Sequence, residues 1–386
     1  MPSRIYIKCL VGCKVTKYTH RIYGANGKLE IVSQRTYTLL HIHITILHKV
    51  THLLTTNPYV VVIALDFSKA FDTVRHFTLL EKLAKLDIPD SVYNWLVSFF
   101  SERTHCTEYC GVKSPPHEIT ASIIQGSGIG PVAYVVNAAD LETVTPGNAM
   151  CKYADDTYLI VPAENVNSRS AEIDNVEEWS RANNLRLNRT KTYEIVFTDN
   201  RRKRVSQPPP PIPGIARTST LKILGVTITS GLSMSEHQRN VTTSCAQTLY
   251  ALKVLRAHGM CDTALQTIYR SVVIAKLRYA SSAWWGFASA TDRQRINAFL
   301  RRGQRSGFCP ADVTTFEELC ESADHQLLNS ILANPNHLLY ELLPPISPSL
   351  QHYNLRERSH NRQLPDKSTH IMDSNFIYRI LYRNTY

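Results

Sequence analysis

Long apolar runs are missing from this sequence of 386 residues. A membrane-spanning helix needs about 20 consecutive apolar residues, and no stretch approaches that length. The apolar residues near the start are interrupted by Lys8 and Lys14, which is atypical of a secretory signal. We therefore expect a soluble, intracellular protein, in the nucleus or the cytoplasm, that has no membrane partner.

Zinc-ligand spacing is missing as well. The nine cysteines include two C-x3-C pairs, Cys9/Cys13 and Cys106/Cys110, but neither pair has a matching second half. Because the cysteines are odd in number and scattered, they favour reduced thiols over a disulfide framework. Four histidines lie close together without a Cys or carboxylate partner, and we expect them on the surface of a helix: His41, His43, His48 and His52.

Acidic residues are fewer than basic ones. Lys and Arg total 43 against 32 Asp and Glu, so the formal net charge is +11 at pH 7. This balance favours a polyanionic partner such as nucleic acid, although ribosomal and membrane-surface proteins share it. The sequence contains no Walker-type phosphate loop, His-Glu-x-x-His motif or nucleophile elbow, which excludes the enzyme classes that those motifs define.

Two adjacent carboxylates, Asp155 and Asp156, stand between two β-prone runs. Neighbouring side chains of a regular strand point to opposite faces, so both can serve one site only at the tip of a hairpin. A third carboxylate, Asp66, follows the apolar run 60–65, which predicts a strand buried on both faces. Carboxylates are suitable ligands for hard divalent cations, so these three residues predict a metal site.

The segments Ala64–Val74 and Tyr153–Asp156 closely resemble catalytic motifs of reverse transcriptases of non-LTR (LINE-type, jockey-like) retrotransposons. The resemblance runs from about residue 39 to at least 310, with four motifs in order. It implies an α+β fold: a right-hand polymerase palm, with a small antiparallel sheet and helices, followed by a mainly α-helical thumb. It also implies an RNA-directed DNA polymerase, a nucleotidyltransferase that uses an RNA template, a DNA primer and deoxynucleoside triphosphates.

The resemblance further implies a metal role for each carboxylate. Asp66 and Asp155 would share two Mg²⁺ ions, or Mn²⁺, and Asp156 would support them. The backbone carbonyl of Phe67 would be an additional ligand. Two such cations can stabilise both the attacking and the leaving oxygen of a nucleotide transfer.

Four other residues acquire roles from the resemblance, each with a plainer alternative. Phe71 would exclude the 2′-hydroxyl of a ribonucleotide, or it fills the core. Gln125 and Gly126 would position nucleotide and template, or they form an ordinary Gly-Pro turn. Lys191 would protonate the departing pyrophosphate, or it is a solvated surface lysine.

The chain divides by composition and periodicity into several segments. We expect helices over residues 76–86 and 171–183 and a strand over 193–197. The full division is 1–38, unassigned; 39–200, palm with residual fingers; 201–218, basic and Pro-rich connection; 219–232, primer-grip-like strands; 233–310, helical thumb; and 311–386, C-terminal tail.

Two parts of the family pattern are not recognisable. The family places basic fingers before the Asp66 strand, and many members add an N-terminal endonuclease; we therefore expect an N-terminally truncated chain. Two other hypotheses stay open. The chain could be a catalytically silent, nucleic-acid-binding fragment of a mobile element. It could also be an RNA-templated RNA polymerase, but Phe71 would exclude the ribonucleotides that such an enzyme needs.

Overall fold

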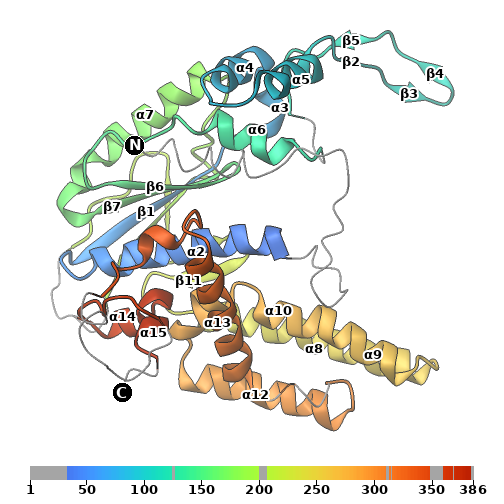
Figure 1. Cartoon of the computed structure of the whole chain (residues 1–386), viewed down its shortest axis with the longest axis vertical. Helices are drawn as coiled ribbons and strands as arrows, with labels where there is room; N and C mark the ends of the chain where they lie inside the picture. The colour runs from blue at the N-terminus through green and yellow to red at the C-terminus, as the bar shows by residue number, and fades with distance from the viewer. Residues whose placement is uncertain are drawn as a thin grey trace. The chain divides into compact units, whose positions relative to one another are not determined.

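The computed structural model describes residues 33–123, 127–199, 207–309, 313, 315–347, 360–367 and 369–383, with side chains from residue 40 onward. These residues form two compact units (Figure 1). Unit 1 contains residues 61–194 and 209–217, and unit 2 contains the described residues outside those ranges. No helix in these stretches combines the length and apolar character needed to cross a bilayer.

Unit 1 is built on a five-stranded sheet of order β6-β7-β1-β8-β9, and β1, β8 and β9 continue into unit 2. The strands of the sheet are β1 (Tyr59–Leu65), β6 (Ala149–Tyr153), β7 (Asp156–Pro162), β8 (Tyr193–Thr198) and β9 (Ala216–Thr218). The helices are α3 (Ala70–Thr73), α4 (His76–Ala84), α5 (Asp90–Phe100), α6 (Gly130–Asn137), η1 (Ala163–Ser168) and α7 (Arg169–Ala182). A narrow ribbon extends beyond α5 (Figure 1) and consists of β2 (Thr104–His105), β3 (Glu108–Tyr109), β4 (Val112–Lys113) and β5 (His117–Glu118).

The central strand β1 is buried as its composition predicts. Val60, Val61, Val62 and Ile63 have no exposed surface, so both faces of the strand are covered. Full burial of such side chains contributes about 1.5–3 kcal/mol each. This strand therefore holds the residue that follows it, Asp66, on a rigid support.

A buried ion cluster joins β8, α7 and β9 within unit 1. Glu194 has a fully buried side chain and accepts hydrogen bonds from Arg169 Nη1 at 2.8 Å and from Arg217 Nε at 2.8 Å. Arg169 also donates to the carbonyl oxygens of Val166 and Pro210. One carboxylate thus pairs with two guanidinium groups.

Unit 2 is mainly helical and also contains one hairpin. The hairpin consists of β10 (Thr220–Ile223) and β11 (Val226–Thr229). The longer helices are α2 (Ser33–Leu53), α8 (Ser235–Ala257), α9 (Asp262–Ile268), α12 (Ala290–Arg305) and α13 (Phe316–Ala333). The shorter ones are η2 (Tyr269–Ile274), α10 (Ala275–Arg278), α11 (Ser281–Trp284), η3 (Trp285–Phe287), η4 (Tyr340–Leu342), α14 (His370–Ser374) and α15 (Phe376–Leu381). Together the two units confirm the α+β class expected from the sequence.

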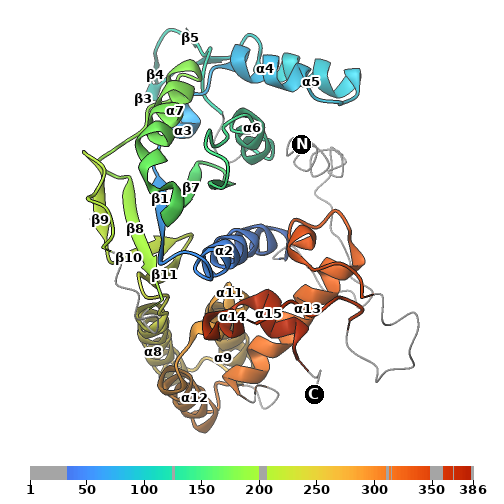
Figure 2. The ribbon, with the colours of Figure 1, turned by 90° about the vertical axis from the view of Figure 1, so that its left-hand side faces the viewer.

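Helix α2 lies inside unit 2, against α11, α14 and α15 (Figure 2). The expected surface position is therefore wrong for His41 and His43, whose residues are 7% and 1% exposed. The ring of His43 donates from Nε2 to the carbonyl oxygen of Ile223 at 2.8 Å. His48 and His52 share a face as expected, with ring centroids 6.3 Å apart.

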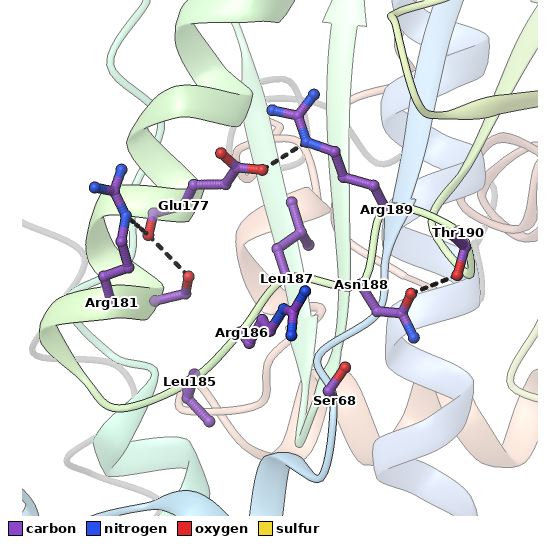
Figure 3. Close-up of a pocket in the computed structure, with 10 residues that line it drawn as sticks. Ser68, Glu177, Arg181, Leu185, Arg186, Leu187, Asn188, Arg189 and Thr190 are labelled. Carbon is purple, nitrogen blue, oxygen red and sulfur yellow. Dashed lines mark hydrogen bonds and ion pairs between the residues drawn. The ribbon is translucent and has the colours of Figure 1, made fainter.

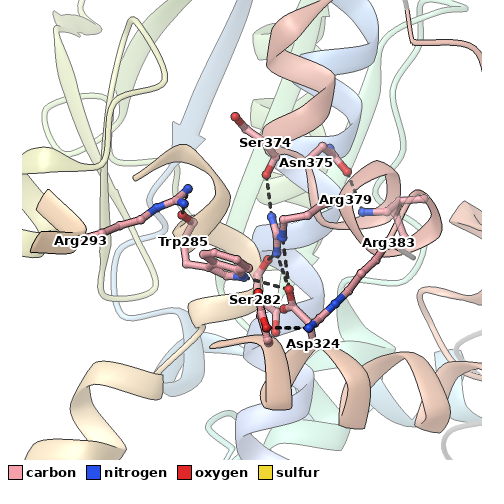
Figure 4. A network of polar contacts seen from close by, with 10 residues as sticks. Ser282, Trp285, Arg293, Asp324, Ser374, Asn375, Arg379 and Arg383 are labelled. Atoms are coloured by element: carbon pink, nitrogen blue, oxygen red, sulfur yellow. Dashed lines mark hydrogen bonds and ion pairs between the residues drawn. The ribbon is translucent and has the colours of Figure 1, made fainter. Parts of the chain in front are cut away.

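The C-terminal helices are tied to the rest of unit 2 by a buried polar network (Figure 4). Arg379 donates to Asp324 at 2.9 Å, and its guanidinium lies 4.6 Å from the centre of the Trp285 ring. Trp285 Nε1 donates to the same carboxylate at 2.8 Å. A second long-range contact joins Asn375 Nδ2 to Thr51 Oγ1 at 3.0 Å. Helical structure thus continues beyond residue 310.

Candidate active site

The hairpin expected around Asp155 and Asp156 is confirmed. Strands β6 and β7 are antiparallel, and Tyr153 pairs with Asp156, so Ala154 and Asp155 form a two-residue turn. Ala154 has φ of 49°, a left-handed conformation that lets the chain reverse this tightly. Asp155 therefore lies at the tip and Asp156 begins the return strand.

Asp66 lies at the end of β1, beside residues 186–192. Its N–H donates to Thr192 Oγ1 at 3.3 Å, and its carbonyl accepts from the Asn188 N–H at 2.8 Å. The next residue, Phe67, pairs with Leu187, and its ring centroid lies 5.9 Å from that of Trp179 on α7. Because neighbours in an extended segment point to opposite sides, Asp66 faces away from α7.

The three carboxylates affect one another electrostatically. Loss of solvent, followed by the charges of Asp155 and Asp66, raises the pKa of Asp156 to about 6, although the residue as a whole is exposed. Burial and the charge of Asp66 also raise the pKa of Asp155. Negative charge from two separate segments is thus concentrated at one place.

The chemistry of these donors fits a divalent cation. Hard cations prefer carboxylate oxygens, and a cation would relieve the repulsion that adds to the effect of burial on both pKa values. Within the residues that the structure describes, however, no three His, Cys, Asp or Glu side chains are spaced to hold an ion together. The residues fit such an ion by chemistry and by proximity, without forming a closed ligand shell.

Two aromatic rings lie next to the carboxylates. Phe71, on the single turn α3, has its ring centroid 4.8 Å from that of Tyr134 on α6. Burial and the charges of Asp155 and Asp156 raise the pKa of the Tyr134 hydroxyl, which places this residue close to the hairpin tip. Phe71, through its contact with Tyr134, therefore lies near the carboxylates.

The other residues predicted for the site are Lys191, Gln125 and Gly126. Lys191 is exposed and belongs to a turn in which its N–H donates to the Asn188 carbonyl, beside the Asp66 segment. Gln125 and Gly126 lie outside the described residues.

In unit 2, Leu224 and Gly225 form the two-residue turn of the β10–β11 hairpin, with φ of 40° and 91°, as a type I′ turn requires.

A pocket of about 610 Å³ lies between α7 and residues 185–190 (Figure 3). Its arginines are partly engaged, since Arg189 donates to Glu177 at 2.6 Å and Arg181 donates to the Glu177 carbonyl. The last turn of α7 lines the pocket, and the carbonyl end of a helix disfavours anions. This pocket is therefore unfavourable for an anionic ligand.

Sequence reasoning missed three residues of this site: Tyr134, Trp179 and Thr192. Tyr134 and Trp179 occur within helices, where an aromatic residue predicts core packing. Their contacts with Phe71 and Phe67 join segments far apart in the chain. A local pattern contains no signal for such a contact.

Residues 14–228 match the family described as "Reverse transcriptase (RNA-dependent DNA polymerase)". The RNA-directed DNA polymerase from mobile element jockey of Drosophila melanogaster is 30% identical over 201 residues, which are 47% of this chain and 21% of that protein. A probable RNA-directed DNA polymerase from transposon BS of the same species is 28% identical over 63% of this chain and 28% of that protein. The chain thus spans 21% to 28% of the length of these relatives.

A solved structure of telomerase from Candida tropicalis, in complex with a fragment of telomeric RNA, is also similar. The TM-score is 0.43 and the sequence identity 14%, over 88% of this chain and 56% of that chain. At these values the likeness adds nothing to the family match.

Proposed function

The chain belongs to the reverse transcriptase (RNA-dependent DNA polymerase) family, and from this premise we propose that it extends a DNA primer by copying an RNA template. The observation that carries the proposal is the convergence of Asp66 with Asp155 and Asp156 at the end of β1. A polymerase needs concentrated negative charge of this kind beside the primer end.

In the proposed reaction, the primer 3′-hydroxyl attacks the α-phosphorus of a deoxynucleoside triphosphate. An oxygen–phosphorus bond forms, the bond to the β-phosphate oxygen breaks, and pyrophosphate departs. The hydroxyl proton passes to solvent water, and Lys191 supplies a proton to the pyrophosphate. The exposed position of Lys191 in the turn beside Asp66 supports this role.

Reverse transcriptases generally use divalent metal ions, and we assign Asp66, Asp155 and the Phe67 carbonyl to two Mg²⁺ ions, or Mn²⁺. When bound, these ions would supply positive charge to the attacking and leaving oxygens. Asp156 would support the arrangement through its charge. The rigid β1 strand and the tight turn at Ala154 fix where these carboxylates lie.

Three other residues would select and position the nucleotide. Phe71 would exclude a 2′-hydroxyl by steric repulsion, which its half-buried ring near the carboxylates supports. Gln125 and Gly126 would position the nucleotide and template. The basic helices α8 and α12 of unit 2 would contact backbone phosphates without reading sequence, as in the expected thumb.

The proposed partners are therefore an RNA template, a DNA primer and deoxynucleoside triphosphates, with the nucleus or the cytoplasm as the place of action. The alternative is a fragment that binds nucleic acid and does no chemistry. The net charge of +11 favours binding under either proposal, so binding alone does not separate them.

Primer extension on an RNA template with Mg²⁺ tests the proposal. We expect the purified chain to extend the primer and Asp155→Asn to reduce the rate by about 100- to 1,000-fold, since it removes electrostatic support of the transition state. Asp174→Asn removes the same charge from an exposed position on α7 and should retain the rate. Salt-sensitive filter binding without extension, in all three proteins, would favour the silent fragment.

A further inference from the structure

Phe71 and Tyr134 form an aromatic pair whose two members differ in burial. Their ring centroids are 4.8 Å apart and their planes are inclined by 31°. Phe71 is half-buried, whereas Tyr134 is 1% exposed. One ring is therefore fixed in the interior of unit 1 and the other reaches its surface.

The element that carries Phe71 gives the ring little stiffness of its own. Helix α3 is a single turn of four residues, and Lys69, directly before it, has φ of 49°. The backbone of this turn accepts two long-range hydrogen bonds, from the Ile123 N–H to the Phe71 carbonyl at 2.7 Å and from Asn184 Nδ2 to the Thr73 carbonyl at 2.7 Å. Because one isolated turn is only marginally stable, the position of the ring depends on what packs behind it.

The element that carries Tyr134 is better anchored. Helix α6 begins with Pro131 in its first turn and buries Ala133, Tyr134, Val136 and Asn137. Packing inside a protein is close to crystalline density, so a buried ring of this size moves only if its neighbours move. In the described part of the chain the Tyr134 hydroxyl has no hydrogen-bond partner, so its ring is held by packing alone.

The discrimination that a steric gate achieves depends on how firmly its ring is held in place. The gate selects against a ribonucleotide because the extra oxygen collides with a ring, and the cost of that collision cannot exceed the cost of displacing the ring. A shift of about 1 Å in a positioned group can already cost about 100-fold in an enzymatic rate, so small displacements matter. A half-exposed ring on a single turn needs a rigid neighbour to discriminate.

We propose that Tyr134 is the positioning residue of the sugar gate, and that its buried ring holds Phe71 against displacement by a 2′-hydroxyl. The inference rests on the proposed function, which gives Phe71 its role. Tyr134 acts through Phe71 and does not touch the nucleotide. Ring packing is the active feature, so the tyrosine hydroxyl is dispensable for discrimination.

The test measures nucleotide binding without chemistry. A primer ending in a dideoxynucleotide is annealed to an RNA template that presents uracil, and the Kd values of deoxyadenosine and adenosine triphosphate are measured for the ternary complex with Mg²⁺. The ratio of the two Kd values is the discrimination. The variants are Tyr134→Ala, Tyr134→Phe, Phe71→Val, the double variant Phe71→Val/Tyr134→Ala, and the control Asn137→Ala, which shortens another buried side chain of α6.

We expect Tyr134→Ala to reduce the discrimination by about tenfold or more, in the range that a change of pocket packing produces. Tyr134→Phe and Asn137→Ala should keep the wild-type ratio. Phe71→Val should lose the discrimination, and Tyr134→Ala should then have no further effect, because two residues that act through one contact are not additive.

An unchanged ratio in Tyr134→Ala, or an equal loss in Asn137→Ala, would overturn the inference. So would a wild-type protein that binds both nucleotides equally or binds neither. Failure of the proposed function is a separate result: a chain that binds with the expected ratios but never extends an unblocked primer would refute polymerisation and still support the role of Tyr134.

Discussion

Removal of the Glu194 carboxylate should destabilise unit 1 strongly. The side chain of Glu194 is completely buried, while those of Arg169 and Arg217 are 10% and 23% exposed. Glu194→Gln preserves the volume, so no cavity forms, but it leaves two guanidinium charges without their counter-charge. The effect therefore isolates electrostatics from packing.

The expected loss in free energy of unfolding follows from the burial of each partner. Breaking a buried ion pair by removing one member costs about 3–5 kcal/mol. Arg169 keeps its hydrogen bonds to Val166 and Pro210, and Arg217 is partly open to solvent, so we expect the lower end of that range. With an m-value of about 3 kcal/mol per molar urea, a loss of about 3 kcal/mol lowers the unfolding midpoint by about 1 M.

Urea unfolding followed by circular dichroism measures this loss, and Glu177→Gln is the matched control. Glu177 also pairs with an arginine, Arg189, at 2.6 Å, but the side chains are 30% and 36% exposed. An exposed pair contributes about 0.2–1 kcal/mol, so the control should shift the midpoint little. Equal shifts in the two variants would refute the claim that burial sets the cost.

Three other results are expected. Arg379→Ala should speed hydrogen exchange in residues 369–383, because it leaves the buried Asp324 carboxylate without its charged partner; unchanged exchange would contradict this role. Burial, followed by the charges of His43 and Lys222, lowers the pKa of His237 to about 4, so its folded form stays neutral while the unfolded form is protonated below 6.5. The contribution of this group to the free energy of unfolding should therefore be complete above pH 6.5 and should decrease towards pH 4 by at most about 1.4 kcal/mol per pH unit. Urea titrations at several pH values should show a smaller decrease for His237→Gln. Mg²⁺ at ten times its Kd should stabilise the wild type by about 1.4 kcal/mol in thermal unfolding, and the same concentration should have little effect on Asp155→Asn if that carboxylate binds the ion.

The hairpin at Asp155 and Asp156 and the strand before Asp66 could be predicted because their signal is local. An Asp-Asp pair between two β-prone runs requires a turn, and the structure has that turn at Ala154 and Asp155. The run before Asp66 likewise reads as a strand buried on both faces, as β1 is. Hydrophobic pattern and chain reversal are properties of neighbouring residues, and a sequence displays them directly.

The buried polar contacts could not be predicted because they depend on distant partners. Glu194 is the second residue of β8, where a charged side chain favours a solvent-exposed position. Its burial is tolerable because Arg169 and Arg217 pair with it. The same holds for His43, whose ring is satisfied by the Ile223 carbonyl 180 residues away. No periodicity within α2 distinguishes a buried histidine with a partner from an exposed one.

The contact between Thr51 and Asn375 has a consequence for synthesis. It closes a loop of 324 residues, so α2 leaves the ribosome long before α14 and α15, the helices that cover it. At about 5–20 residues per second, ribosomal elongation takes roughly 15–65 s to supply these partners. Throughout that interval the apolar side chains of α2 need a temporary cover, and the nascent chain is exposed to aggregation before its last helices are made.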